Sequence, residues 1–473
     1  MHARTETIRA LAHYLEQWLA FQGAHARIPG IQAAVRVGEE LVLNTAWGVA
    51  DTSTGEELTT GHLFRIASHS KTFTATAIMQ LVEAGRLRLD DPLGEHIPEL
   101  ADAPIAVVTV REALGHQGGI IRDGRDKGFW QRLTPFPDRA GLLRLATDEA
   151  LTYQRNEHFK YSNVSYSLLG LVIEAASGTG YADYVREHVI DRLGLADTGP
   201  EFDPARAADF VHGHTALLHG SDQREPITHV DSRAFGPATG FYSTAADVTT
   251  YGAAHFLGSD ALLTDASKRV MQRLESVIEG PGTPTARYGV GMSLRRLGDR
   301  DLAGHAGGYP GQITRTYIDA TDQIVVSVLT NAIDGPADAL ATGIVRLIEL
   351  ALNPPPAPAS APGPEVDLDR YVGRFASLWG VTDVARAGDQ LYLLTPSNPD
   401  PTEAYLQVTP TGANSLQIES ASGFGPVGEQ VRYERDDDDQ ITSVWIGGAQ
   451  AWPTQAFLAR RSDLARGPLP GGA

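Results

Sequence analysis

The amino-acid sequence predicts an α+β domain followed by a small all-β domain. Extended segments occur near both ends of the first 352 residues, at 31–47 and at 313–331, and the pattern between them is mostly helical. This order requires the chain to return to one sheet at its end, which places the helices at one side and a cleft between the two halves. Beyond a proline-rich stretch, short extended segments recur between turn residues, which is typical of a small sandwich or barrel.

Periodicity and turn residues predict the individual elements of the first domain. Residues 1–22 form an amphipathic helical pattern, and residues 31–37 and 41–47 flank a turn at 38–40, which indicates a hairpin. A long helical pattern runs from Ser68 to Ala84, and Gly85 follows where a C-cap would lie. Further helices are predicted at 110–115, 139–147, 165–176, 181–193, 245–256, 265–277 and 337–352, and strands at 313–319 and 324–331.

The proline-rich stretch predicts a domain boundary. We expect a first domain at 1–352, an extended linker at 353–364 and an all-β domain at 365–473. Strands of that last domain are predicted at 390–394, 404–408, 415–419, 430–434 and 441–446. The acidic run at 436–439 is most simply a solvated hairpin tip.

Composition excludes several classes of function. The net charge of −19 over 473 residues argues against nucleic acid as a partner. The absence of Cys excludes disulfides and thiolate metal sites, and His212 and His214 have no third ligand nearby in the sequence, so no metal or cofactor is expected. We see neither a signal peptide nor an apolar run long enough for a membrane span, and therefore expect a cytoplasmic protein without a membrane partner.

Three short motifs carry residues suited to nucleophilic catalysis. Ser68 and Lys71 are three positions apart at the start of the long helix, so the hydroxyl and the amine share one face. Tyr161 and Asn163 lie just before a later helix and offer a proton relay and an amide. His305, Gly307 and Gly308 precede the two late strands, where small residues let a substrate backbone come close. Each motif alone is as well explained by helix capping or by a turn.

Taken together and in this order, the motifs resemble the penicillin-recognising serine hydrolases, which include class C β-lactamases, D,D-carboxypeptidases, D-aminopeptidases and esterases. The resemblance extends to the segments at 64–67, 114–119 and 240–247 and covers residues 28–352. It implies a β-lactamase-like catalytic domain, an antiparallel sheet with helices plus an all-helical subdomain. The segment that opens at 368–375 is similar to the lipocalin-like β-domain of some of these peptidases, which implies a role over the cleft or in a homo-oligomer. The alternative is an appendage that adds stability and has no role in specificity.

The resemblance also implies roles for the residues of the three motifs. Ser68 would be the acylated nucleophile, Lys71 its proton partner, Tyr161 the general base and later acid, and Asn163 the group that orients Lys71 and the substrate amide. Backbone N–H groups of Ser68 and Gly308, with Gly307 beside them, would bind the oxyanion and the substrate. His305 stands where β-lactamases have Lys, and Gln117 where a small hydroxyl residue is usual; both alter the substrate side of the site. Whether Lys71 or Tyr161 takes the proton from serine stays open.

The sequence therefore predicts a serine hydrolase that cleaves small esters or peptide and amide bonds through an acyl-enzyme on Ser68. Because neutral imidazole is a poor counter-ion for a carboxylate, a D-aminopeptidase or esterase is favoured. The alternative enzyme is a β-lactamase or D,D-carboxypeptidase, and the alternative from another class is a catalytically silent binding module. The expected partner is a small molecule or short peptide.

Overall fold

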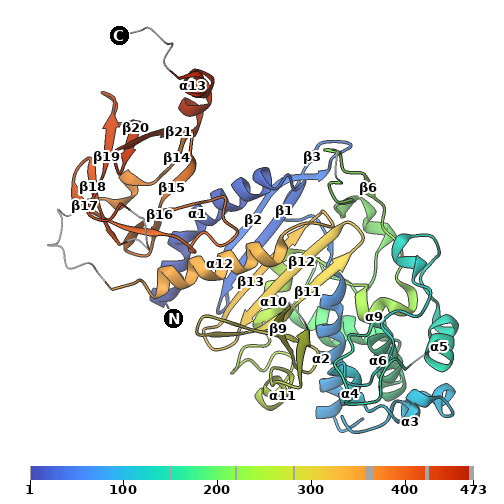
Figure 1. Cartoon of the computed structure of the whole chain (residues 1–473). Helices are drawn as coiled ribbons and strands as arrows, with labels where there is room; N and C mark the ends of the chain where they lie inside the picture. Colours follow the sequence, from blue (N-terminus) through green and yellow to red (C-terminus); the bar gives the residue numbers. More distant parts are fainter. Residues whose placement is uncertain are drawn as a thin grey trace. The chain divides into compact units, whose positions relative to one another are not determined.

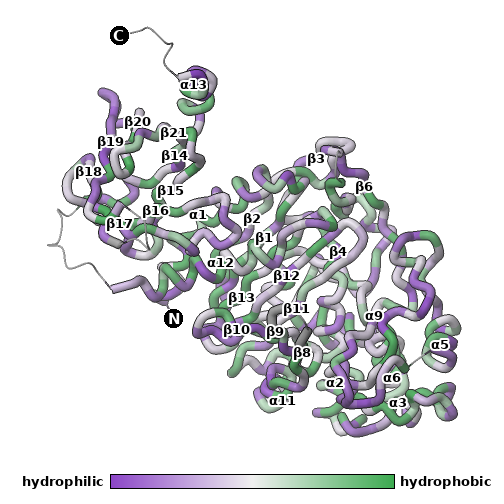
Figure 2. The backbone as a smooth tube through the Cα atoms, viewed as in Figure 1, coloured by the Kyte–Doolittle hydropathy of each residue, from purple (hydrophilic) through white to green (hydrophobic). Residues whose placement is uncertain are grey.

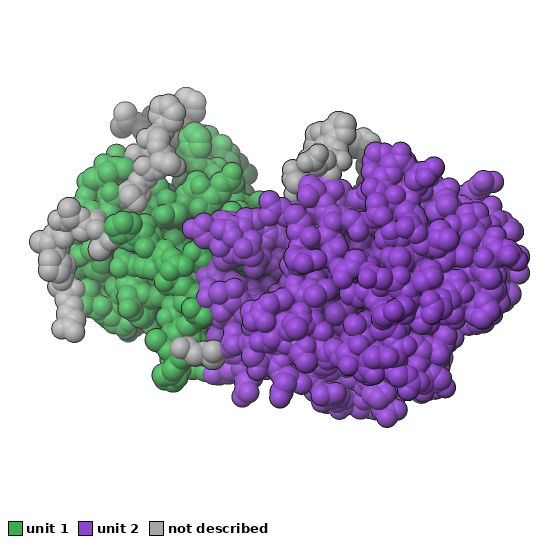
Figure 3. Space-filling model, turned by 90° about the horizontal axis from the view of Figure 1, so that it is seen from below, with its two compact units in different colours: residues 1–26, 342–473 green, residues 27–341 purple. Residues whose placement is uncertain are grey.

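The computed structural model describes residues 2–149, 151–218, 221–280, 283–356, 366–420 and 426–467. The chain divides into two compact units, one of residues 1–26 with 342–473 and one of residues 27–341 (Figures 1 and 3). The N-terminal helix and most of the helix at 337–352 thus group with the C-terminal barrel. Since compact units and evolutionary domains need not coincide, the boundaries at 352 and 364 stay predictions, and residues 357–364 of the expected linker lie outside the described residues.

The larger unit is built on one nine-stranded sheet of order β3-β2-β1-β13-β12-β11-β10-β9-β8, in which neighbouring strands pair antiparallel. Because β13 pairs with β1, the two ends of this unit share a sheet, as the sequence predicted. The strands are β1 (Gly30–Val37), β2 (Glu40–Asp51), β3 (Glu56–Glu57), β8 (Ser276–Gly280), β9 (Thr283–Tyr288), β10 (Ser293–Leu297), β11 (Arg300–Tyr309), β12 (Gln312–Asp319) and β13 (Ile324–Thr330).

Helices and short turns fill the long stretch between β2 and β8. Helices α2, α6 and α9 pack on one another, and α10 packs on β1 and β13 (Figure 1). The α-helices of this unit are α2 (Ser70–Glu83), α3 (Leu93–His96), α4 (Val110–Leu114), α5 (Arg139–Asp148), α6 (Asn163–Ser177), α7 (Tyr181–Val185), α8 (Asp191–Leu193), α9 (Gly236–Thr239), α10 (Ala245–Ala253), α11 (Asp265–Met271) and the start of α12 (Ala337–Leu352), which follows β13. Two short ribbons, β4 (Phe64–Arg65) with β7 (Tyr242–Ser243) and β5 (Gly213–His214) with β6 (Pro226–Ile227), complete the unit.

The helix predicted at 265–277 is too long. Helix α11 ends at Met271, and β8 begins at Ser276. The apolar residues of this segment fit a helical period, but the pairing of β8 with β9 satisfies the backbone of its last part. Such pairing depends on a partner strand and leaves little trace in a local pattern.

The smaller unit contains a closed barrel of eight antiparallel strands, which confirms the predicted small all-β fold. Strand β19 alternates exposed and buried residues, and its exposed positions are hydrophilic (Figure 2). The acidic run at 436–439 is exposed between β19 and β20, as predicted. The strands are β14 (Gly373–Ser377), β15 (Gly380–Ala387), β16 (Gln390–Leu394), β17 (Leu406–Gly412), β18 (Ser415–Ser420), β19 (Gln430–Arg435), β20 (Ile441–Ile446) and β21 (Ala449–Pro453).

Polar residues inside this unit explain why the sequence did not predict β14 and β15. Asp383 of β15 is buried and ion-paired with Arg374 of β14, with 2.7 Å between Oδ1 and Nε. Tyr14 of α1 (His2–His25) donates to the other oxygen of Asp383 at 3.2 Å. A buried carboxylate breaks the apolar alternation that marks a strand. Helix α13 (Thr454–Arg466) follows the barrel. Among the described residues, no helix combines the length and the apolar character that a membrane span requires.

Candidate active site

Ser68 lies in a single 3₁₀ turn, η1 (Ala67–His69), that leads directly into α2. Ala67 has a φ of 49°, a left-handed conformation that residues with a Cβ adopt rarely and that clusters at functional sites. Ser68 is half-buried, whereas Ser70 is fully buried and its hydroxyl is hydrogen-bonded to backbone groups. The strained turn therefore presents one serine, Ser68, at the beginning of a helix.

Lys71 reaches back to this serine, as the spacing predicted. Its Nζ lies 3.2 Å from the Ser68 Oγ, 2.7 Å from the Asn163 Oδ1 and 2.8 Å from the carbonyl oxygen of Ala238. The side chain is fully buried. Burial holds the pKa of Lys71 well below its usual value; the charge of Arg122 acts in the same direction and that of Asp123 opposes it.

Tyr161 and Asn163 come to the same place from the start of α6. The Ser162 side chain caps this helix by accepting from the Ser165 N–H, so Asn163 is its first residue. The Lys71 Nζ lies 4.8 Å from the centre of the Tyr161 ring. Burial raises the pKa of the Tyr161 phenol, and a hydrogen bond with Ser68 opposes that rise. The structure thus brings Ser68, Lys71, Tyr161 and Asn163 together.

Asp123 is a further member of this cluster that the sequence did not single out. Its Oδ1 accepts from the Asn163 Nδ2 at 2.6 Å and from the Trp130 Nε1 at 3.0 Å, and its Oδ2 lies 3.1 Å from the Arg122 Nε. Asp123 is buried. By fixing the amide group of Asn163, it turns the Oδ1 of that residue toward Lys71. An aspartate in a loop carries no local signal of such a partner.

His305 lies in β11, beside η1, and it is buried. Its Nδ1 is 2.6 Å from the Ala306 carbonyl oxygen and its Nε2 is 3.1 Å from the Tyr288 hydroxyl. Since a carbonyl only accepts, the proton sits on Nδ1, and Nε2 accepts from Tyr288. Burial holds the pKa of His305 well below its usual value. The ring is therefore neutral and already satisfied on both sides.

The glycines after His305 allow a close approach of β11 to the serine turn. Gly307 is buried, and a Cβ at this position would overlap the carbonyl oxygen of Ile66. Gly308 is exposed, and the nearest atom to a Cβ there would be Ile313 Cδ1 at 3.6 Å. Strand β11 therefore runs close to η1, and its backbone is exposed at Gly308.

The side chain of Gln117 hydrogen-bonds with the backbone of another segment. It is half-buried, and its Nε2 donates to the carbonyl oxygen of Glu275 at 2.9 Å. Within the part of the chain that the structure describes, its side chain makes no hydrogen bond with Ser68 or Lys71. Its place at the edge of the site stays a prediction.

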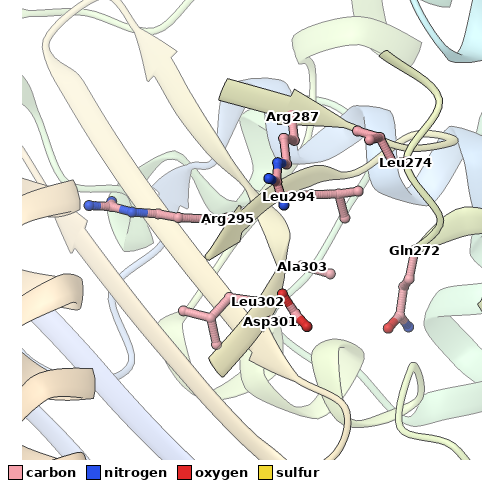
Figure 4. A pocket seen from close by; sticks show the side chains of 8 residues that line it. All are labelled: Gln272, Leu274, Arg287, Leu294, Arg295, Asp301, Leu302 and Ala303. Atoms are coloured by element: carbon pink, nitrogen blue, oxygen red, sulfur yellow. The ribbon is translucent and has the colours of Figure 1, made fainter. Parts of the chain in front are cut away.

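A cavity of about 250 Å³ lies beside β9, β10 and β11, but it contains none of these residues (Figure 4). Figure 4 shows its walls, formed by Gln272, Leu274, Arg287, Leu294, Arg295, Asp301, Leu302 and Ala303. These side chains include neither a nucleophile nor a base near one. The hydrogen-bonded cluster around Ser68, rather than this cavity, identifies the candidate active site. The described residues contain no group of three or more His, Asp or Glu side chains that could hold a metal ion.

The chain is similar in sequence to penicillin-binding proteins and esterases. Penicillin-binding protein 4 of Amycolatopsis lactamdurans is 28% identical over 383 residues, which cover 77% of this chain and 97% of that protein. Esterase EstB of Burkholderia gladioli is 28% identical, with 59% of this chain and 79% of the esterase covered. These relatives are named for penicillin binding and for ester hydrolysis, in line with the predicted superfamily.

Solved structures share the fold. The octameric penicillin-binding protein homologue from Pyrococcus abyssi has a TM-score of 0.63 at 20% identity and covers 93% of this chain and 99% of its own. The D-amino acid amidase from Ochrobactrum anthropi SV3 has a TM-score of 0.62 at 23% identity and covers 72% of this chain and 99% of its own. A family model described as Beta-lactamase matches residues 10–350. Because this match spans well over half of the chain and includes every residue of the cluster around Ser68, the chain belongs to the Beta-lactamase family.

Proposed function

We propose that the protein is a serine hydrolase that forms an acyl-enzyme on Ser68. The observation that carries the proposal is the buried Lys71 Nζ, 3.2 Å from the Ser68 Oγ and fixed by two further hydrogen bonds. Ser68 would attack the carbonyl carbon of an ester or amide, with the N–H groups of Ser68 and Gly308 binding the oxyanion. Removing such a donor typically costs about 10²–10³ in rate.

The geometry favours Lys71 over Tyr161 as the base that takes the serine proton. A neutral amine has two N–H groups and one lone pair. The Asn163 Oδ1 and the Ala238 carbonyl accept the two N–H groups, which leaves the lone pair for the Ser68 hydroxyl. Burial lowers the pKa of Lys71 and raises the pKa of Tyr161. The amine is thus available as a base, while the phenol keeps its proton.

Tyr161 then serves as the acid. The bond between the Ser68 Oγ and the carbonyl carbon forms while the serine proton passes to Lys71. The tetrahedral intermediate collapses, the bond to the leaving group breaks, and Tyr161 gives its proton to the departing alcohol or amine. Lys71 returns its proton to Tyr161, and water attacks the ester by the same route in reverse, which restores the Ser68 hydroxyl.

The neutral state of His305 bears on the substrate. A buried imidazole with both nitrogens satisfied cannot act as the cation that anchors a substrate carboxylate. We therefore favour small esters and short peptides or amides with a D-residue, in keeping with the esterase relative and the amidase fold. The similarity to a penicillin-binding protein over 97% of its length keeps a β-lactamase or D,D-carboxypeptidase as the second candidate. A cytoplasmic location and a homo-oligomer, in analogy to the octameric homologue, complete the proposal.

Intact-protein mass spectrometry tests the acyl-enzyme. The full chain is incubated with p-nitrophenyl esters, D-alanine p-nitroanilide, benzylpenicillin and a fluorophosphonate, in parallel with Ser68→Ala. We expect a covalent adduct on the wild type and none on Ser68→Ala, whose turnover falls by about 10⁴-fold or more, as when a catalytic nucleophile is removed. The substrate that turns over chooses between esterase, aminopeptidase and lactamase.

Ser70→Ala is the matched control. Its hydroxyl donates to the Ala67 carbonyl at 2.5 Å and accepts from the Phe241 N–H at 3.0 Å, so this variant should still be labelled. A labelled Ser68→Ala would show that another residue is the nucleophile. A wild-type protein that neither turns over nor reacts with the fluorophosphonate would favour the binding module instead.

A further inference from the structure

His116 contacts both chain neighbours of Tyr161. It lies in the loop after α4, and its carbonyl oxygen accepts from the Lys160 N–H at 2.8 Å. Its Nδ1 accepts from the Ser162 N–H at 3.1 Å. The imidazole also packs on the Tyr161 ring, with 4.4 Å between ring centres. Three contacts from one residue thus hold the backbone before Tyr161, the backbone after it and its ring.

The backbone of His116 is strained in a way that serves these contacts. Its φ is 58°, in the left-handed region that residues with a Cβ adopt uncommonly, histidine more often than most. Such a conformation costs about 1–3 kcal/mol and persists where surrounding structure demands it, often at active sites. Here it accompanies an arrangement in which the carbonyl and the side chain of one residue both bind the 160–162 segment. An ordinary loop histidine would need no such conformation.

The side chain of His116 is buried and has one polar contact. Because Nδ1 accepts a backbone N–H, the proton of the neutral ring lies on Nε2. This nitrogen has no hydrogen-bond partner among the described residues. The ring lies between Tyr166 and Tyr288, with 5.1 and 4.9 Å between ring centres. Burial, with Lys71, His305 and Arg122 nearby, holds the pKa of His116 well below its usual value. Among the described residues, the hydrogen bond from the Ser162 N–H to Nδ1 is therefore the polar contact that this side chain makes.

We propose that His116 is a positioning residue that sets the place of Tyr161 relative to Ser68 by fixing the backbone on both sides of the tyrosine. The proposal rests on the proposed function, in which Tyr161 is the acid of the reaction. His116 itself would touch neither the substrate nor the reacting atoms. Its effect should therefore appear in the acylation rate and not in substrate affinity.

Two amide substitutions separate this role from simple packing. In His116→Asn the Oδ1 occupies the place of Nδ1 and can accept the Ser162 N–H, whereas in His116→Gln the oxygen lies one bond farther out. We expect His116→Asn to keep acylation within about threefold of the wild type, and His116→Gln to lower it by about 10- to 100-fold, below the 10²–10⁴ of a lost general acid. KM should stay near its wild-type value in both. Release of p-nitroaniline from D-alanine p-nitroanilide, whose departing nitrogen takes up a proton, gives these rates and KM, with thermal unfolding alongside.

A double-mutant cycle with Tyr161→Phe decides whether His116 acts through the tyrosine. We expect His116→Gln to slow the release of p-nitroaniline from D-alanine p-nitroanilide no further in the Tyr161→Phe background, because the group it positions is already absent. An equal loss in both backgrounds, or equal rates for Asn and Gln, would overturn the proposal. If the Gln variant does not fold, His116→Leu takes its place. A wild-type acylation rate in Tyr161→Phe would also overturn the proposal for His116. Fluorophosphonate labelling of Ser68 in that variant would still support the proposed acyl-enzyme on Ser68.

Discussion

The charge state of Lys71 depends on two neighbouring residues that act in opposite directions. Asp123 raises the pKa of Lys71 and Arg122 lowers it, and the two are themselves ion-paired at 3.1 Å. In the proposed mechanism the amine can accept the serine proton only when it is neutral. Acylation should therefore be lost as the pH falls through the pKa of Lys71, so this pKa sets the acid limb of the rate profile.

Removing the charge of Asp123 or that of Arg122 should move the acid limb of the rate profile in opposite directions. Asp123→Asn keeps an oxygen for the Asn163 and Trp130 N–H groups but loses the charge, so the pKa of Lys71 falls and acylation persists to lower pH. Arg122→Gln should shift the limb to higher pH. For nearby charges we expect shifts of about 1 pH unit. The measurement is the rate of Ser68 labelling between pH 4 and 9.

The comparison of these two variants contains its own control. A general disturbance of the site would lower the rate at all pH values and would leave the acid limbs of the two variants at the same pH. If both variants shift the limb in the same direction, Lys71 is not the group that titrates, and the assignment of the base to Lys71 fails.

At the scale of elements, strand β11 is placed by the two glycines that follow His305. Gly307 has no room for a side chain because the carbonyl oxygen of Ile66 and the hydroxyl of Thr314 lie where its Cβ would be. Its neighbour Gly308 faces open space apart from Ile313. The distance between the strand and the serine turn therefore depends on Gly307.

Gly307→Ala should push β11 away from η1. We expect labelling of Ser68 to slow by about tenfold or more, in keeping with a misplaced oxyanion donor, and the thermal midpoint to fall, because overpacking costs about 1–3 kcal/mol. Gly308→Ala is the adjacent control, and its thermal midpoint should stay near that of the wild type. Equal stability and equal labelling of both variants would show that the close approach has no role.

Elements also differ in how well a local pattern reveals them. The helix predicted at 337–352 is found with the same bounds, and the strand predicted at 441–446 likewise. The helix has a clear apolar period. By contrast, β8, β14 and β15 were not predicted. Strand β8 forms through its pairing with β9, and β14 and β15 contain a buried ion pair that interrupts the apolar pattern of a strand.

For the whole molecule, buried neutral histidines link stability to pH. Burial lowers the pKa of His69, His229 and His255 to about 3. In the unfolded chain the same groups titrate near 6.5. Between these values the unfolded state binds more protons than the folded one, so the free energy of unfolding decreases as the pH falls below about 6.5.

His255 offers the clearest test of this linkage. It is fully buried, and neither ring nitrogen has a partner among the described residues. Each such histidine should lower the free energy of unfolding by up to about 1.4 kcal/mol per pH unit below 6.5. His255→Leu should therefore reduce the difference in unfolding free energy between pH 7 and pH 5 by about 1–2 kcal/mol, as measured by urea titration.

His158→Gln is the matched control, since the side chain of His158 is 60% exposed. Its substitution should leave the pH dependence as in the wild type. A His255→Leu variant with an unchanged difference between the two pH values would mean that His255 titrates alike in the folded and unfolded states.

The sequence by itself determined what depends on short separations. Ser68 and Lys71 meet because they are one helical turn apart, and the apolar periods predicted most helices, the central strands and the small all-β fold. Tertiary structure alone decided what depends on distant partners and on burial. Lys71 and Asn163 are 92 positions apart, and Asp123 and Asn163 are 40 apart. The lowered pKa values of Lys71 and His305 arise from loss of solvent around them, and no residue carries that property in its own identity.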